Sequence, residues 1–170
     1  IAGQAKVLFM SDIQVRIADF SRTKDAQALI QLMQEYARDP MGGGVAIDDA
    51  VLASLPLKLQ SYTGAFSVIA WRGETPVGLT NCFETLSSFK VRPLINVHDV
   101  IVTKASRGLG VAPEMLKAVE REANVRSCCK LTLEVLEGNQ RAQEVYLAFG
   151  FSGYELDEKY GKALFWEKAL

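Results

Sequence analysis

The chain has 170 residues, of which 49% are hydrophobic and 23% charged, and its 19 basic and 20 acidic side chains give a formal net charge of -1. A chain of this length buries roughly 70% of its unfolded surface, so neither disulfides nor a metal is needed for stability. The balanced charge excludes a polyelectrolyte tail and predicts no general attraction to nucleic acid or to an anionic membrane. We therefore expect one globular domain whose function depends on local motifs.

The three cysteines are Cys82, Cys128 and Cys129, and they form neither a CxxC pair nor a disulfide framework. An odd number of cysteines, two of them adjacent, favours a reducing compartment, and we expect a cytoplasmic protein. The single histidine, His98, leaves little scope for a zinc site, so no metal is expected. No apolar run approaches the roughly 20 residues of a membrane span.

Residues 1–9 lack an initiator, whereas Met10 and the residues after it look like a natural start. We interpret residues 1–9 as a remnant of an expression vector and expect the domain to occupy residues 10–170.

The first third of the chain predicts a strand followed by two helices. Residues 13–17 alternate in the manner of a strand, and a helix with one apolar face follows and ends before Asp39. Three glycines at 42–44 then predict a loop. The second helix is expected over about residues 48–60, with an interruption near Pro56.

The rest of the chain alternates between strands and helices. Residues 66–71 and 76–84 predict a hairpin, 94–103 a central strand, 131–136 another strand and 163–166 a last one. One helix is expected after residue 107, with Met115, Leu116, Val119 and Ala123 facing inward, and another over 139–149. The strand, helix and strand between about residues 95 and 136 predict two parallel strands. The order indicates an α+β domain with a mixed, mostly antiparallel twisted sheet flanked by helices.

The segment Arg107-Gly108-Leu109-Gly110-Val111-Ala112 lies between a predicted strand and a predicted helix. The first turn of a helix leaves backbone N–H groups unpaired, and glycines let a large anion approach them. This pattern is typical of a pyrophosphate site. A P-loop is excluded because no Gly-Lys-Ser/Thr follows, and the spacing does not fit a dinucleotide-binding turn.

A second segment downstream, with Asn139, Ala142 and Tyr146 followed by Phe149-Gly150-Phe151, completes a pattern. R-G-x-G-x-A after a β-branched strand, then a strand, N-x-x-A-x-x-x-Y and F-G-F, resembles the GNAT superfamily of N-acetyltransferases. The close match covers about residues 96–151, and the remainder agrees in the order of its elements.

This resemblance implies the acyl-CoA N-acyltransferase fold and acetyl-CoA as co-substrate. Backbone N–H groups of the segment 107–112 would hold the pyrophosphate, and the backbone of Val100, Ile101 and Val102 would pair with the pantetheine arm. Asn139 and Ala142 would lie near the cofactor, and Tyr146 beside the thioester sulfur. A phenol remains protonated at neutral pH and can donate a proton to a departing thiolate.

The proton acceptor is expected among three residues. His98 matches the position at which some branches of the family carry a glutamate or a histidine, and a neutral imidazole can take a proton from an ammonium group. On a regular strand His98 would share a face with Asn96 and Val100, and Asp99 would point to the other face with Val97, although a bulge would alter this. Asp99 is a candidate for orienting the substrate, and Glu84 is the alternative base.

We therefore expect an N-acetyltransferase that moves an acetyl group from acetyl-CoA to a primary amine of a small molecule by direct attack in a ternary complex. Two alternatives stay open: acetylation of proteins or peptides, and a non-catalytic module that binds acyl-CoA. No nucleic-acid or membrane partner is expected, and a homodimer is left open.

Overall fold

The computed structural model describes residues 12–154, 157, 159, 161 and 163–170. Its contacts divide the chain into two units, Ile1–Leu133 and Glu134–Leu170, and each is described by itself. Residues 1–9, which we expected to be a vector remnant, lie outside the described residues.

A five-stranded sheet is the frame of the first unit. Its strands lie side by side in chain order; the first four are antiparallel neighbours, and the fifth runs parallel to the fourth. The sheet is therefore mixed and mostly antiparallel, which confirms the expected fold class and the expected parallel pair. The strands are β1 (Ile13–Ile17), β2 (Ala65–Arg72), β3 (Thr75–Ser87), β4 (Arg92–Val102) and β5 (Leu131–Leu133).

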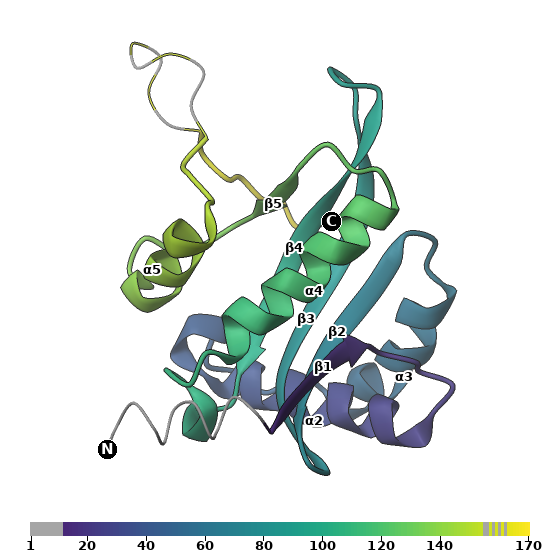
Figure 1. Cartoon of the computed structure of the whole chain (residues 1–170). Helices are drawn as coiled ribbons and strands as arrows, with labels where there is room; N and C mark the ends of the chain where they lie inside the picture. Colours follow the sequence, from purple (N-terminus) through teal and green to yellow (C-terminus); the bar gives the residue numbers. More distant parts are fainter. Residues whose placement is uncertain (1–11, 155–156, 158, 160, 162) are drawn as a thin grey trace. The chain divides into compact units, whose positions relative to one another are not determined.

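Helices cover both faces of this sheet (Figure 1). On one face, called here the α2 face, lie α2 (Thr23–Arg38) and α3 (Asp49–Ser61), and α4 (Val111–Val125) crosses the other, the α4 face. Short 3-10 helices follow α2 and precede α4: η1 (Pro40–Gly42) and η2 (Lys104–Ser106).

On the α2 face, Leu29 and Leu32 of α2 are fully buried and pack against a row of strand side chains, Ile69, Leu79 and Ile101. Complete burial of a leucine contributes roughly 1.5–3 kcal/mol relative to exposure. This packing fixes α2 against the strands that carry the candidate site.

The α4 face buries the four helix residues that the sequence predicted to face inward: Met115, Leu116, Val119 and Ala123. Gly78 of β3 allows the close approach of the helix, because a Cβ at this position would lie 2.9 Å from the sulfur of Met115 and 2.9 Å from Cγ1 of Val111. The N-terminal end of α4 is thus held directly on the centre of the sheet.

Two elements differ from the expected ones in the first unit. α3 continues through Pro56, which is buried together with Leu52 and Leu59. Burial of this face and the Asp48 cap, whose carboxylate accepts from the N–H groups of Ala50 and Val51 at 2.9 and 3.2 Å, offset the hydrogen bond that the proline removes. β5 ends at Leu133 rather than at residue 136.

The second unit contains α5 (Gln140–Phe149), which agrees with the predicted helix. The strand expected over residues 163–166 is wrong: these residues form no strand, and Leu164, Phe165 and Trp166 are exposed. Their apolar character fits a strand, but a strand also needs a neighbour for its backbone N–H and C=O groups, which periodicity does not specify. No helix among the described residues is both long and apolar enough to span a membrane.

A buried ion pair joins β1 to the start of α2. Both terminal nitrogens of Arg16 donate to the Asp25 carboxylate at 2.6 Å, and the backbone N–H of Asp19 donates to it at 2.8 Å. The Asp25 side chain is fully buried, whereas that of Arg16 is 39% exposed. Burial by itself raises the pKa of Asp25, but the hydrogen bonds from Arg16 and Asp19 outweigh it, and the net pKa is lowered.

We expect Asp25→Asn to lower the free energy of unfolding at pH 7 by about 2 kcal/mol, because the buried side chain loses the charge-assisted hydrogen bonds that it accepts from the partly exposed Arg16. Asp49→Asn, an exposed change on α3, is the control and should cost little. Urea unfolding measures both variants.

The acid range provides a second check. The lowered pKa of Asp25 means that its stabilising effect is complete above its unfolded pKa of about 3.9 and is lost as the pH falls through the lower, folded value. The difference between wild type and Asp25→Asn should shrink over that range, and a difference that stays constant down to the lowest accessible pH would contradict the assignment.

Candidate active site

A bulge in β4 is the central feature of the candidate site. Asn81 of β3 is paired with Asp99, but its neighbour Cys82 is paired with Val97, so His98 is the extra residue on β4. A bulge bends its strand and redirects the side chains beside it. The two candidate residues His98 and Asp99 are therefore at the one irregular point of the β3–β4 pairing.

The bulge brings His98 and Asp99 to the same face of the sheet. The His98 ring contacts the ring of Phe83 edge to face, with centroids 5.4 Å apart, and the amide nitrogen of Asn81 donates to Asp99 at 2.9 Å. Asn81 and Phe83 are two residues apart on β3 and point to one face. The expectation for a regular strand, with His98 and Asp99 on opposite faces, is thus wrong, and the exception that it allowed for a bulge applies.

Neighbouring residues confirm which face this is. Ile101, paired with Leu79, belongs to the α2-face core, and the Asn81 amide nitrogen lies 3.4 Å from the sulfur of Met33 on α2. Val97 and Val100 pair with Cys82 and Thr80, which alternate with Asn81 and so point to the α4 face. On a regular strand Asp99 would share a face with Val97, and His98 would share one with Val100. In this structure neither pair shares a face.

Glu84, the alternative base, has a different environment. Its carboxylate accepts from Arg126 at the end of α4 at 3.2 Å, and the Arg126 guanidinium also lies over the ring of Phe66, 4.6 Å from its centroid. Glu84 therefore belongs to an ion pair on the α4 face and is not brought together with His98 and Asp99.

The glycine-rich segment forms the turn into α4. Gly108 and Gly110 have φ values of +80° and +86°, and Gly110 is the N-cap of the helix. This left-handed conformation favours glycine, and it directs the chain into a helix whose first turn begins at Val111 and Ala112. Pro113 has no N–H group, so the unpaired donors of this turn are concentrated at its very start.

Arg107 anchors this turn to the end of α2. Its Nε donates to the carbonyl of Val102 at 3.1 Å, and a terminal nitrogen donates to the Asp39 carboxylate at 2.7 Å. This bond, with help from the N–H of Met41, lowers the pKa of Asp39. The Arg107 guanidinium is thus occupied by the Val102 carbonyl and the Asp39 carboxylate. Any contribution of Arg107 to an anion site would come from its backbone N–H group.

Beyond the bulge, none of the described strands pairs with the β5 side of β4. β5 pairs only with Ile95, Asn96 and Val97 and then ends at Leu133, so from His98 to Val102 the described strands pair β4 on its β3 side alone. An unpaired edge presents backbone N–H and C=O groups to a partner. These are the residues, Val100 to Val102, that were expected to pair with the pantetheine arm.

The downstream candidates lie in the second unit. The Asn139 side-chain oxygen accepts from the N–H of Ala142 at 3.3 Å and caps α5. The Tyr146 ring packs edge to face on Phe151, with centroids 5.9 Å apart, and Gly150 ends the helix with a φ of +104°. In the pattern N-x-x-A-x-x-x-Y, Asn139 is thus the N-cap of α5, Ala142 donates the N–H that this cap accepts, and Tyr146 is an aromatic residue of the same helix.

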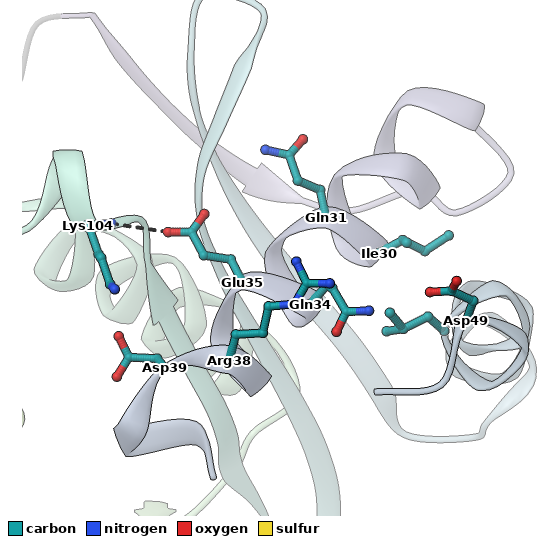
Figure 2. A pocket seen from close by; sticks show the side chains of 9 residues that line it. Ile30, Gln31, Gln34, Glu35, Arg38, Asp39, Asp49 and Lys104 are labelled. Carbon is teal, nitrogen blue, oxygen red and sulfur yellow. Dashed lines mark hydrogen bonds between the residues drawn. The ribbon is translucent and has the colours of Figure 1, made fainter. Parts of the chain in front are cut away.

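A pocket that the sequence did not predict lies on the outer side of α2 (Figure 2). It has a volume of about 630 Å³, and its wall carries charges of both signs. One interaction across it, from the backbone N–H of Lys104 to Glu35 at 3.2 Å, ties η2 to α2. His98 and Asp99 do not line this pocket. The lining residues are Ile30, Gln31, Gln34, Glu35, Arg38, Asp39, Asp49, Leu52 and Lys104.

Sequence reasoning also missed two residues beneath the bulge. Ser67 donates to the oxygen of the Asn81 side chain at 2.7 Å, and both residues are buried. The available signal was the polar Asn81 within the otherwise apolar run of β3, but its partners depend on the register of three strands.

Residues 26–151 match the model of the acetyltransferase (GNAT) family, which is well over half of the chain. The chain belongs to the GNAT family of acetyltransferases. The resemblance predicted from the glycine-rich turn and the downstream helix is thereby confirmed at the level of the family.

Two relatives illustrate the sequence similarity. An uncharacterized N-acetyltransferase of Bacillus subtilis, YhfO, is 25% identical over 143 residues, which are 81% of this chain and 88% of that protein. Thialysine N-epsilon-acetyltransferase of Bos taurus is 33% identical over 79 residues, or 46% of each chain.

Solved GNAT structures share the fold. The aminoglycoside acetyltransferase meta-AAC0020 from an uncultured soil metagenomic sample, in complex with sisomicin, has a TM-score of 0.78 at 13% identity, covering 95% of this chain and 99% of its own. The aminoglycoside N-acetyltransferase AAC(6')-Iy in complex with CoA has a TM-score of 0.71 at 18% identity, covering 93% and 95%. At these identities the likeness shows the fold alone.

Proposed function

We propose that this GNAT protein transfers an acetyl group from acetyl-CoA to a primary amine of a small molecule, by direct attack within a ternary complex. The observation that carries the proposal is the bulge of β4, which presents His98 and Asp99 together where the strand loses its parallel neighbour. The similarity to a thialysine N-epsilon-acetyltransferase and to aminoglycoside acetyltransferases supports a small-molecule amine as acceptor.

The residues of the first unit fit acetyl-CoA. The turn at Gly108 and Gly110 offers backbone N–H groups of Val111 and Ala112 to a pyrophosphate without an intervening Cβ. The open edge from Val100 to Val102 offers backbone groups to an amide-bearing arm. When bound, acetyl-CoA supplies an activated acetyl thioester.

In this proposal His98 takes the proton from the acceptor's ammonium group, directly or through a water molecule, and leaves a neutral amine that can attack. The backbone N–H of Val102, which the alternation of the strand directs away from β3, donates to the acetyl carbonyl oxygen. Alignment of the two substrates on one rigid strand supplies a large share of the rate.

Tyr146 is proposed as the proton donor to the departing sulfur, with Asn139 and Ala142 beside the cofactor. The motif of the family supports these roles, and the capped helix shows that the chain builds the corresponding element. A thiol relay is not favoured, because burial raises the pKa of Cys82 to about 12 and also raises that of Cys128.

The test of the proposal is release of free thiol when the protein is mixed with acetyl-CoA and a panel of amines, amino acids and peptides. Thiol release that requires a small amine supports it. Release only with peptides would point to a protein acetyltransferase, and binding of acetyl-CoA with no release for any acceptor would point to a non-catalytic module.

Gly110→Val should weaken acetyl-CoA binding at least tenfold, which is about 1.4 kcal/mol. A β-branched side chain would place a Cβ where the pyrophosphate meets the backbone, and the φ of +86° is strained for valine. Gly73→Val is the matched control, because Gly73 also has a positive φ, of +57°, but lies in the hairpin between β2 and β3. Calorimetry with acetyl-CoA measures both, and equal affinity in the two variants would remove the turn from the site.

Tyr146→Phe should reduce turnover by roughly 10² to 10⁴ with little change in acetyl-CoA affinity, because the ring remains and the proton donor is lost. Tyr154→Phe, in the same unit, is the control. Single-turnover rates isolate the chemical step, and an unchanged rate for Tyr146→Phe would make Tyr146 a packing residue.

His98→Gln should lower the rate at limiting amine and remove from the pH–rate profile the inflection that is due to the ionising base of the enzyme. The rate rises with pH as a base loses its proton, and the ionisation of the acceptor adds its own rise. Acceptors of different basicity separate the two, since the inflection of an enzyme group stays at one pH whereas that of the acceptor moves.

The matched comparison is Glu84→Gln, which changes the ion pair on the α4 face and should leave the fixed inflection in place. If the fixed inflection survives in His98→Gln and disappears in Glu84→Gln, the base is Glu84. If it survives in both variants and in Asp99→Asn, water removes the proton.

A further inference from the structure

Asp99 has an uncompensated carboxylate. It is half-buried and accepts a hydrogen bond from the neutral amide of Asn81 at 2.9 Å, and no ion pair involves it within the part of the chain that the structure describes. The other buried or half-buried aspartates of the described core, Asp25 and Asp39, each have an arginine. A half-buried carboxylate without a cation has oxygen lone pairs left to accept charge-assisted hydrogen bonds from a ligand.

The support beneath this carboxylate is buried and directional. Ser67 on β2 donates to the Asn81 oxygen at 2.7 Å, which leaves the Asn81 nitrogen to donate to Asp99. Ser67 is 1% exposed and Asn81 is 2% exposed, so the first of these two hydrogen bonds is buried, and the second is part-buried at Asp99. Such a chain fixes the orientation of the carboxylate more firmly than a solvated partner would.

Aromatic groups lie on the same face of the sheet as the Asp99 carboxylate. His98, the next residue to Asp99 on β4, contacts the Phe83 ring of β3, and the Tyr62 ring contacts Phe83 edge to face with centroids 5.9 Å apart. Tyr36 of α2 is near enough that, after burial, the charge of Asp99 is the main cause that raises the pKa of its phenol. A carboxylate among aromatic rings is a suitable environment for an ammonium group.

We infer that the Asp99 carboxylate binds the ammonium group of the acceptor, and that Asn81 and Ser67 are positioning residues that orient it. The inference rests on the proposed function, since it names the group that recognises the amine of that reaction. It places the nitrogen beside His98, which then takes its proton. The acceptor class is accordingly an amine that is cationic when it binds.

Binding of a simple probe tests the inference without the reaction. The probe is benzylammonium, with benzyl alcohol as its neutral counterpart, titrated into the full chain by nuclear magnetic resonance. We expect wild type to bind benzylammonium at least tenfold more tightly than benzyl alcohol and Asp99→Asn to lose that preference. Asp99→Ser replaces Asp99→Asn if the latter does not fold. No measurable binding of benzylammonium by wild type, or an unchanged affinity in the Asp99 variant, overturns the inference.

The positioning role has its own variants. Asn81→Leu and Ser67→Ala should weaken benzylammonium binding several-fold and leave benzyl alcohol unaffected. Thr80→Val is the control, because Thr80 is a buried polar residue of the same strand that points to the α4 face. Equal losses in Thr80→Val and Asn81→Leu would reduce Asn81 to a structural residue.

Kinetics separate this inference from the proposed function. Asp99→Asn should raise the KM of cationic acceptors about tenfold to a hundredfold, with the KM of acetyl-CoA unchanged and a smaller effect on weakly basic acceptors that bind as neutral amines. Benzylammonium binding that depends on Asp99 without any acetyl transfer would refute the proposed function alone. Acetyl transfer that is indifferent to Asp99 would refute this inference alone.

Discussion

The candidate site depends on one extra residue in β4. If β3 and β4 paired without the bulge at His98, the alternation of a strand would send His98 and Asp99 to opposite faces, one toward α2 and the other toward α4. The bulge instead puts an imidazole and a carboxylate next to each other on the α2 face. The bulge also coincides with the end of the β4–β5 pairing. The alternation of the side chains therefore shifts at the same point at which β4 stops pairing with β5.

The bulge is held in place by hydrogen bonds to β3 and by packing on the α2 face. The Ser67–Asn81–Asp99 hydrogen bonds tie it to β2 and β3, and beyond it Ile101 is locked into the core with Leu79 and α2. The next turn of the chain is fixed by Arg107, which connects the glycine-rich turn to Asp39 at the end of α2. The Asp39 carboxylate also accepts from the N–H of Met41, and its backbone carbonyl accepts from Gly42 and Gly44, so this one residue organises both the α2–α3 connection and the entry to α4.

The sequence predicted the elements well where a local pattern decides them. The alternation of 13–17, the apolar face of α4 and the helix over 139–149 are all local, and the structure has them. The strand at 163–166 failed because apolar character does not provide a pairing partner, and the interruption at Pro56 failed because tertiary burial of one helix face outweighs the lost hydrogen bond.

The site was predicted less completely for the same reason. The glycine-rich turn has a local signature, whereas the bulge depends on the register between two strands and the Asn81 network on the register of three. The polar pocket on α2 likewise arises from residues of α2, α3 and η2 that only the fold brings together. Polar residues inside apolar strand runs, such as Asn81, are the signal by which such networks can be found.

The most direct test of the account is an initial-rate experiment in which acetyl-CoA and an acceptor amine are both varied. Direct transfer requires both substrates on the protein at once, so the double-reciprocal lines are expected to intersect. Parallel lines would indicate a covalent acetyl-protein formed before the amine binds. That result would contradict an attack by the amine at the β4 bulge and would require a nucleophile that the raised pKa values of Cys82 and Cys128 do not favour.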